Sequence, residues 1–362
     1  MKLLLFIDNL GSGGAQRQLI GLAVMLKQYG YEVKVCTYYP HDFYKYYLDE
    51  NNVPNEIIPN ASDKIKRILS VVNFFKREKP DWVIAYQETP SLIACVAKLF
   101  GCKYKLIVSE RNTTQSENII SSIRFFLYHW ANAIVPNSYT QENYLINHHP
   151  WMASKLKTIT NFVDIDTFSP IQHRKRKETP LFMVAATISK SKNTIGLIEA
   201  LKLIKDLNYR FKIKWYGYSE YNIDYYKFCI NKIAEYELEG YIELLPKTIN
   251  IKSCYDEADY FCLPSFYEGT PNVICEAISC GIPVLCSDIC DNSLYVVDGQ
   301  NGILFDPYSS KNIANAIVTA IEQTDIEYTS YSLKSRLIAE EKLSKTKFIN
   351  QYIEIITENN RN

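Results

Sequence analysis

The sequence predicts an α/β protein with two doubly wound domains, each a parallel sheet covered by helices on both faces. Short apolar runs alternate over residues 1–136 with segments whose apolar residues recur at helical spacing. The alternation stops at residues 173–180, a polar and highly charged segment, and begins again at residue 181. A length of 362 residues, of which 47% are hydrophobic and 22% charged, is typical of about two soluble domains.

The first domain, residues 1–172, opens with an apolar strand at Leu3–Ile7. A glycine turn at Gly11–Gly14 follows, and helical spacing of apolar residues predicts a helix over Gln16–Tyr29. Gly30 ends that helix, because glycine readily adopts the left-handed conformation of a helix C-terminus. Further strands are expected at residues 32–37, 82–85, 104–109 and 133–136, and further helices at 64–79, 90–100 and 119–130.

The second domain, residues 173–341, begins with the charged linker. We expect the C-terminal segment, residues 342–362, to form a helix at about 342–357 and to pack back on the first domain. Alternation in both halves predicts two Rossmann-like domains that face each other across a cleft. Strands of the second domain are expected at residues 181–185, 211–217, 241–245, 260–264 and 284–287.

Composition excludes several classes of protein. The formal net charge is zero, which argues against a nucleic-acid partner. Residues 1–165 hold 18 lysines and arginines against 14 aspartates and glutamates, so this slightly basic half would suit an anionic membrane surface. Ten cysteines stand singly, mostly in apolar runs, which indicates reduced thiols in a cytoplasmic protein. No run approaches the roughly 18 apolar residues of a membrane span.

The most informative segment is Glu268–Glu276, which follows an apolar run expected to form a buried strand. Thr270 is expected to cap a short helix and Pro271 to occupy its first position, where the missing N–H costs nothing. Gly281 is expected to end the helix. Amides at a helix start favour phosphate, whereas the neighbouring carboxylates accept hydrogen bonds from sugar hydroxyls. The segment therefore predicts a pocket for a ligand that contains both phosphate and sugar.

The glycine turn lies between the first strand and the first helix, at an edge where doubly wound folds bind ligands. Gly13 and Gly14 would let the backbone approach a phosphate closely. The turn is not a dinucleotide fingerprint, because Gln16 stands at the third glycine position and the second strand ends without an acidic residue. The alternative is a tight turn without a ligand.

These features resemble family 4 glycosyltransferases of the GT-B fold, and the likeness runs nearly end to end. The resemblance implies an acceptor in the first domain, a nucleotide-sugar donor in the second, and retaining transfer that needs no metal. It rests on segments Gly13–Gln16, Pro136–Ser138, Asn161–Pro170, Glu268–Pro283 and Val297–Phe305, in that order.

The resemblance also implies roles for single residues. Glu276 would bind the nucleotide ribose, and Glu268 would hold donor-sugar hydroxyls and stabilise positive charge at the anomeric carbon. Lys192 matches the family's phosphate-binding lysine and would neutralise the leaving diphosphate. The family usually has an arginine where this chain has Thr187, so either another cation such as Lys190 helps or phosphate binding is weaker. The implied donor-binding set is Gly13, Gly14, Lys192, Gly269, Thr270, Pro271, Asn272 and Glu276.

Glu110 completes the predicted catalytic set with Lys192 and Glu268, because Glu110 or its neighbour Arg111 follows a strand and would contact donor or acceptor. A surface salt bridge of Glu110 is the alternative. Asp164 and Asp166 form a D-x-D, a metal-binding pattern in another glycosyltransferase class. Their place in a loop favours a turn, and we expect no metal site.

Two helices admit a membrane interpretation. Residues 63–79 predict a basic amphipathic helix, and packing on the sheet explains its apolar stripe by itself. Contact of its basic face with anionic lipid headgroups is the functional alternative. Residues 119–130 admit the same two interpretations. The apolar stripe of the first helix is predicted to comprise Ile65, Ile68, Leu69, Val72 and Phe75.

We therefore expect a glycosyltransferase that moves a hexosyl or N-acetylhexosaminyl group from a UDP- or GDP-sugar to a hydroxyl of a glycan or lipid-linked acceptor. The product would belong to a surface polysaccharide such as capsule, O-antigen or lipopolysaccharide. We expect the protein to be cytoplasmic, or peripheral on the inner face of the cell membrane. Two alternatives stay open: a sugar-nucleotide epimerase, whose added acid and base the sequence does not reveal, and a non-catalytic sugar- or lipid-binding scaffold.

Overall fold

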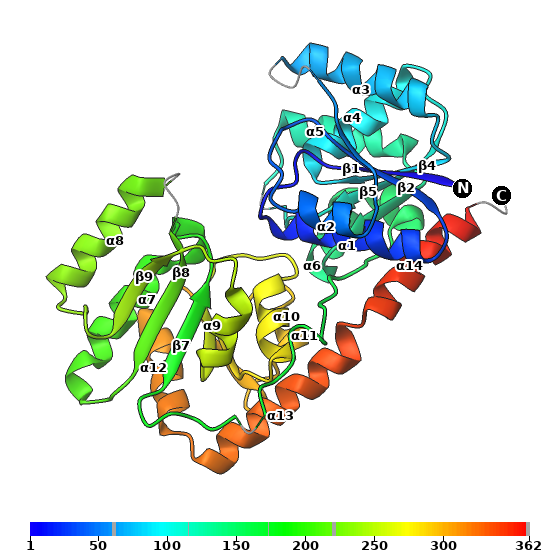
Figure 1. The fold of residues 1–362 in the computed structure, drawn as a ribbon. Helices are drawn as coiled ribbons and strands as arrows, with labels where there is room; N and C mark the ends of the chain where they lie inside the picture. Colours follow the sequence, from blue (N-terminus) through cyan, green and yellow to red (C-terminus); the bar gives the residue numbers. More distant parts are fainter. Residues whose placement is uncertain (60–62, 115, 173, 219–221, 360–362) are drawn as a thin grey trace. The chain divides into compact units, whose positions relative to one another are not determined.

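A computed structural model describes residues 1–59, 63–114, 116–172, 174–218 and 222–359. The chain forms two compact units (Figure 1). Unit 1 comprises Met1–Asn161 and the residues from Thr346 onward, and unit 2 comprises Phe162–Lys345. The boundary between the units therefore lies ahead of the predicted linker. His173, at the start of that linker, and residues 360–362 of the C-terminal segment lie outside the described residues.

Unit 1 is built on a parallel sheet with the strand order β3-β2-β1-β4-β5-β6 in the described part of the chain. The central strands are buried on both faces, as in β1, because helices cover the sheet from both sides. The strands are β1 (Lys2–Phe6), β2 (Glu32–Thr37), β3 (Asn55–Ile57), β4 (Trp82–Tyr86), β5 (Lys105–Glu110) and β6 (Ala133–Pro136). The helices are α1 (Gly14–Gln28), α2 (Lys45–Glu50), α3 (Lys64–Glu78), α4 (Glu88–Leu99), α5 (Ile119–Leu127) with the 3-10 turn η1 (Tyr128–Trp130), α6 (Tyr139–His148) followed by η2 (Pro150–Lys155), and α14 (Lys345–Glu358).

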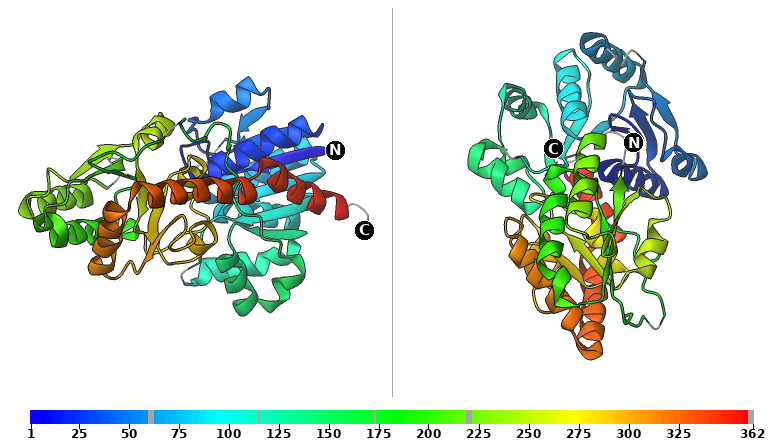
Figure 2. Two further views of the ribbon diagram at one scale, coloured as in Figure 1. Left: turned by 90° about the horizontal axis from the view of Figure 1, so that it is seen from below. Right: turned by 90° about the vertical axis from the view of Figure 1, so that its left-hand side faces the viewer.

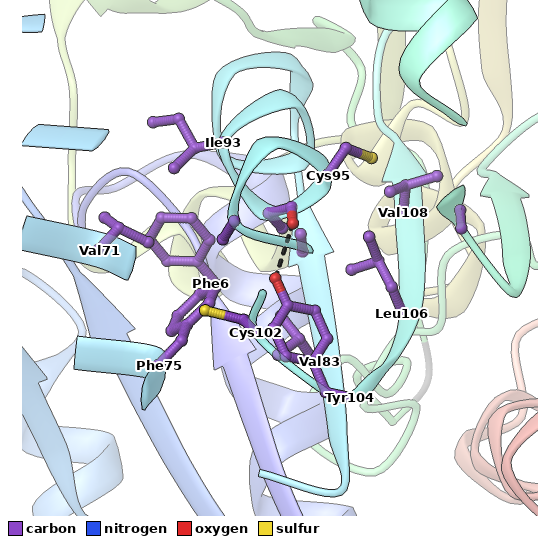
Figure 3. Close-up of a cluster of buried hydrophobic side chains, with 14 of the residues drawn as sticks. Phe6, Val71, Phe75, Val83, Ile93, Cys95, Cys102, Tyr104, Leu106 and Val108 are labelled. Atoms are coloured by element: carbon purple, nitrogen blue, oxygen red, sulfur yellow. Dashed lines mark hydrogen bonds between the residues drawn. The ribbon is translucent and has the colours of Figure 1, made fainter. Parts of the chain in front are cut away.

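One apolar cluster joins α3, α4 and α5 to the sheet of unit 1 (Figure 3). Phe6 of β1 packs edge-on against Phe75 of α3, with ring centroids 5.4 Å apart. The hydroxyl of Tyr104 donates a 2.6 Å hydrogen bond to the carbonyl of Ala94 in α4, so this buried phenol is satisfied. These contacts fix α3 and α4 on the sheet, and Phe125 and Leu127 of α5 join the same cluster.

The C-terminal helix α14 belongs to unit 1, and it runs beside α1 in the left view of Figure 2. The hydroxyls of Tyr352 and Tyr86 share a buried hydrogen bond of 2.7 Å. An ion pair of 2.8 Å joins Lys157 to Glu354. A buried bond and a surface ion pair therefore tie the end of the chain to the sheet of unit 1.

Unit 2 repeats the architecture with the order β12-β11-β10-β7-β8-β9, again parallel throughout the described strands. Separate apolar clusters fill the two faces of this sheet. The strands are β7 (Leu181–Ala185), β8 (Lys212–Tyr218), β9 (Ile242–Pro246), β10 (Tyr260–Leu263), β11 (Val284–Ser287) and β12 (Gly302–Phe305). The helices are α7 (Thr194–Ile204), α8 (Ile223–Glu235), α9 (Ile251–Glu257), α10 (Asn272–Ser279), α11 (Asn292–Tyr295), α12 (Ser310–Glu322) and α13 (Asp325–Lys342), with the 3-10 turns η3 (Lys190–Lys192) and η4 (Lys205–Leu207).

The predicted fold class, two doubly wound parallel sheets, is confirmed. In each sheet the first strand of the unit is central, and the chain adds strands first on one side of it and then on the other. The order reverses between β1 and β4 in unit 1 and between β7 and β10 in unit 2. Loops leave such neighbouring strands in opposite directions, so each reversal is a place where this fold binds ligands.

Candidate functional site

The reversal point of unit 2 brings two predicted site residues together. β7 and β10 pair in parallel, so their carboxyl ends lie at the same edge of the sheet. The loop after β7 carries Lys192, and the loop after β10 carries Glu268. The backbone N–H of Phe266 donates a 3.0 Å hydrogen bond to the carbonyl of Ser191, which ties the two loops to each other.

Lys192 and Glu268 form an ion pair, with Nζ and Oε1 2.5 Å apart. The Ser265 hydroxyl donates a 2.6 Å hydrogen bond to the same carboxylate oxygen. The lysine side chain is 26% exposed and the glutamate side chain 13%, so a ligand from solvent can reach the pair. Any anion that binds the ammonium must therefore compete with the carboxylate.

Asn193 fixes the position of the lysine. It adopts a left-handed conformation with φ 54°, and its side-chain oxygen caps α7 by accepting a 3.2 Å hydrogen bond from the N–H of Gly196. The side-chain NH₂ donates a 2.8 Å hydrogen bond to the carbonyl of Pro307. Because these bonds fix the conformation of the residue after Lys192, a rigid turn holds the ammonium group at the strand edge. Lys190 is exposed and Thr187 partly exposed in the same loop.

Helix α10 places the second glutamate. It begins one residue later than predicted: Pro271 is its N-cap and Asn272 its first residue, whereas the sequence predicted Thr270 as the cap. Pro271 can cap because the carbonyl of an N-cap, not its missing N–H, makes the first helical bond, here with Cys275. The predicted end is confirmed, since Gly281 has φ 67° just past the helix.

Glu276 lies in the second turn of α10 and is only 2% exposed. The hydroxyl of Tyr255, from α9, donates a 3.0 Å hydrogen bond to Oε2 of this carboxylate and a 3.2 Å bond to the carbonyl of Val273. The carboxylate is thus oriented before any ligand binds. Tyr255 was missed by the sequence analysis because no local pattern marks a hydrogen-bond partner 21 residues away.

The predicted phosphate loop of unit 1 lies at the β1–β4 reversal. Gly13 is the N-cap of α1, and a Cβ atom there would collide with the side chain of Gln16. Gln16 donates a 3.2 Å hydrogen bond to the carboxylate of Asp8, whose pKa is raised by burial. A larger residue at position 13 would therefore displace the Gln16 side chain from this contact, and Gly14 opens the helix itself.

Glu110 is the last residue of β5 and is 1% exposed, so the structure encloses its carboxylate. Tyr128 donates a hydrogen bond to Oε1, and Arg124 Nη2 lies 3.3 Å from Oε2. Burial raises the pKa of this carboxyl, although the nearby guanidinium opposes the effect. Arg124 also pairs with Glu88 at 2.8 Å. The salt bridge is therefore buried, not at the surface, and the catalytic role of Glu110 stays a prediction.

The D-x-D segment forms a turn. The N–H of Thr167 donates to Asp164 Oδ1 at 3.4 Å, and Lys345 pairs with Asp164 Oδ2 at 2.7 Å. Across the described residues no group of three or more histidine, cysteine or acidic side chains is arranged to hold a metal ion. All ten cysteines are described, and none of them forms a disulfide there.

Comparison with known proteins identifies the class to which this fold and site belong. Residues 166–337 match the family model for group 1 glycosyl transferases, and residues 12–167 match the model for glycosyltransferase family 4. The chain belongs to the group 1 glycosyltransferases of the GT-B fold, and it is an enzyme of that class.

Individual proteins are similar over nearly the same length. The amylovoran biosynthesis glycosyltransferase AmsD of Erwinia amylovora is 24% identical, over 87% of this chain and 90% of its own. An α-1,4-N-acetyl-D-galactosaminyltransferase of Campylobacter jejuni, named for a glycan on diphospho-undecaprenol, is 25% identical over 77% of each chain. The crystal structure of Anabaena HepE in complex with UDP and glucose superposes with a TM-score of 0.87, covering 99% of this chain and 100% of that one at 21% identity.

Proposed function

We propose that this glycosyltransferase is a retaining enzyme that moves a hexosyl or N-acetylhexosaminyl group from a UDP- or GDP-sugar to a hydroxyl of a glycan or lipid-linked acceptor. The observation that carries the proposal is the Lys192–Glu268 pair at the reversal point of unit 2, directly ahead of the helix that holds Glu276. The relatives support a role in surface polysaccharide synthesis, such as that of capsule, O-antigen or lipopolysaccharide, through the amylovoran and diphospho-undecaprenol in their names.

In this proposal unit 2 binds the donor. Glu276 accepts hydrogen bonds from the ribose hydroxyls, because its carboxylate is already oriented by Tyr255. The backbone from Gly269 to Asn272, at the start of α10, faces the sugar and the diphosphate. The diphosphate replaces Glu268 as the partner of the Lys192 ammonium group, and the released carboxylate then accepts hydrogen bonds from hydroxyls of the donor sugar. The ion pair thus keeps both groups in place until the donor arrives.

Transfer follows with retention of configuration. The bond from the anomeric carbon to the diphosphate oxygen breaks, and the acceptor oxygen bonds to the same face of that carbon. The acceptor proton passes to the departing phosphate oxygen. Lys192 neutralises the charge that develops on the diphosphate, so the proposal requires no metal ion. Glu268 stabilises the positive charge on the sugar.

Unit 1 binds the acceptor in this proposal, with Gly13 and Gly14 as its predicted phosphate-binding residues and Glu110 as its predicted catalytic residue. A lipid-linked acceptor would bring the protein to the inner face of the cell membrane as a peripheral protein, with basic α3 against anionic headgroups. Within the described residues no helix is long and apolar enough to cross a membrane.

Replacement of Glu276 tests the donor site. A thermal-shift screen against nucleotides first selects the tightest ligand, since bound ligand stabilises the native state by mass action. Glu276→Ala should weaken that nucleotide by about 10- to 100-fold in calorimetric titration, because a buried charged hydrogen bond contributes about 1.5–3 kcal/mol. Glu340→Ala, an exposed glutamate of α13, is the control and should bind normally. Unchanged affinity in a folded Glu276→Ala protein contradicts the assignment.

A further inference from the structure

Helix α5 and the turn η1 present an unusual amount of apolar surface to solvent. The exposed fractions are 80% for Ile119, 68% for Ile120, 50% for Ile123, 61% for Phe126 and 36% for Trp130. These positions follow helical spacing along one side, and the ring of Phe126 contacts that of Trp130 with centroids 5.9 Å apart. An open hollow of about 580 Å³ runs along this side. We call these five residues the α5 apolar face.

The opposite side of α5 is buried and mixed, because the apolar side chains of Phe125 and Leu127 pack in the core beside polar residues. Arg124 is 4% exposed and pairs with Glu110 and Glu88, and Ser121 is buried in a capping box with Asn118. An amphipathic helix of a water-soluble domain normally turns its charged side outward. Here apolar residues lie on both sides of the helix, and the buried ion pairs of Arg124 and the cap fix which side faces inward. The exposure of the apolar face is therefore built into the packing of unit 1.

The flank of unit 1 that α3 and α4 form beside α5 is net basic. Helix α4 lies between α3 and α5 and contacts both, as the right view of Figure 2 shows. Residues 63–103, which span α3 and α4, contain eight lysines and arginines against four aspartates and glutamates. Helix α3 also exposes Ile65 and Leu69, by 72% and 47%. The exposed cations of this helix and its C-cap are Lys64, Lys66, Lys76, Arg77 and Lys79.

Two more ammonium groups lie at the end of the face. Lys98 donates a 2.8 Å hydrogen bond to the carbonyl of Trp130, and Lys155 donates to the carbonyls of His129 and Ala131 at 2.7 and 2.8 Å. Aliphatic side chains, a tryptophan at the edge and flanking cations are the combination that binds the interface of an anionic bilayer. A protein partner would not require this basic border.

We propose that the α5 apolar face enters the boundary between headgroups and acyl chains of an anionic membrane, while the cations of α3 contact the headgroups. Apolar burial supplies the affinity, and the cations make it depend on anionic lipid and on salt. The biological purpose of this membrane contact rests on the proposed lipid-linked acceptor, whereas the contact itself does not. Binding to vesicles can be measured without any donor or acceptor.

The test is co-flotation of the full chain with vesicles of 70% phosphatidylcholine and 30% phosphatidylglycerol. The double variant Ile123→Glu/Phe126→Glu should bind at least about tenfold more weakly, since two apolar side chains leave the bilayer and two charges would have to enter it. The control variant Ile326→Glu/Leu333→Glu changes two exposed apolar residues of α13, 82% and 63% exposed, and should bind like the wild type. Both variants should bind nucleotide normally, which shows that they fold.

Three outcomes overturn the inference: no vesicle binding by the wild type, full binding by the α5 variant, or a wild-type dimer that the α5 variant dissociates without any vesicle binding. The last would assign the face to a second copy of the chain. Trp130 adds an independent readout, because its emission should shift to the blue on vesicles and the shift should vanish in Trp130→Phe. If the wild type binds nucleotide but not vesicles, only this inference is contradicted. If it binds vesicles but not nucleotide, only the proposed donor site is contradicted.

Discussion

The ion pair between Lys192 and Glu268 has two consequences at the scale of single residues. It holds the ammonium and the carboxylate at the strand edge, where Ser265 supports the carboxylate. It also makes the carboxylate a competitor of any phosphate for the ammonium. The same side chain would thus oppose the binding of nucleotide alone and assist transfer of the sugar.

Glu268→Gln separates these two effects. Loss of the negative charge should tighten binding of the free nucleotide diphosphate by about three- to tenfold, because Lys192 is no longer neutralised. Transfer should slow on the order of 100-fold, because nothing then stabilises the positive charge on the sugar. Calorimetry and initial rates measure the two quantities. Weaker nucleotide binding by a folded variant would mean that the carboxylate does not compete for the lysine.

Sequence reasoning found some residues of the candidate site and not others for identifiable reasons. Glu268 and Glu276 lie on one short segment between a strand and a helix, so a local pattern reveals both. Lys192 follows a strand that is adjacent to theirs only in the folded sheet, and it was found through the family resemblance. Tyr255 and Asn193 act through long-range hydrogen bonds to Glu276 and Pro307, which no spacing in the sequence encodes.

Among the elements, the strands were predicted well and the faces of the helices less well. The bounds of β2, β6, β7 and β11 were predicted to the residue, and in the last three an apolar run buried on both faces has sharp ends. The short edge strand β3 was missed, since its residues are only partly buried or exposed.

The two membrane-candidate helices show why the faces were harder to predict. The apolar stripe predicted for α3 was wrong at Ile65 and Leu69, which are exposed, while Val71 and Phe74 are buried. Apolar residues occur on both sides of α3, as they do on both sides of α5. Periodicity alone therefore cannot decide which side packs on the sheet.

A charge network joins the end of α3 to the sheet of unit 1 and predicts a pH dependence. Glu78 meets three cationic partners, Lys2 of β1, Lys34 of β2 and its neighbour Arg77. Burial raises the pKa of Glu78, but the hydrogen bonds from these partners outweigh it and lower the pKa from 4.5 to about 2. A depressed pKa means that the folded state favours the carboxylate, so its stabilisation is complete above pH 4.5 and disappears as pH falls toward 2.

The free energy of unfolding of unit 1, measured with urea at several pH values, tests this contribution. The wild type should lose about 1 kcal/mol more than Glu78→Gln between pH 5 and pH 2, since screening by solvent reduces what the pKa shift alone would give. At pH 7 the variant should be the less stable protein. If acid lowers the free energy of unfolding equally in the two proteins, the network contributes nothing to stability.

For the whole molecule, two units of like topology make two similar sheet edges, each with a loop at the reversal of strand order. The sequence predicted this duplication because the alternation of strands and helices stops once and restarts. It did not predict where the chain passes from one unit to the other. Phe162 and Thr346 stand in segments without a change of composition, whereas the conspicuous charged linker lies inside unit 2.

The central claim is that a nucleotide diphosphate binds to unit 2, at the loops after β7 and β10 and the start of α10. Hydrogen–deuterium exchange of the full chain, with and without the nucleotide selected by thermal shift, tests this claim most directly. We predict slower exchange at residues 187–193 and 264–276 in the wild type, and no such change in Glu276→Ala at the same ligand concentration. Saturating nucleotide that leaves both segments unprotected, or protects only segments of unit 1, would contradict the account.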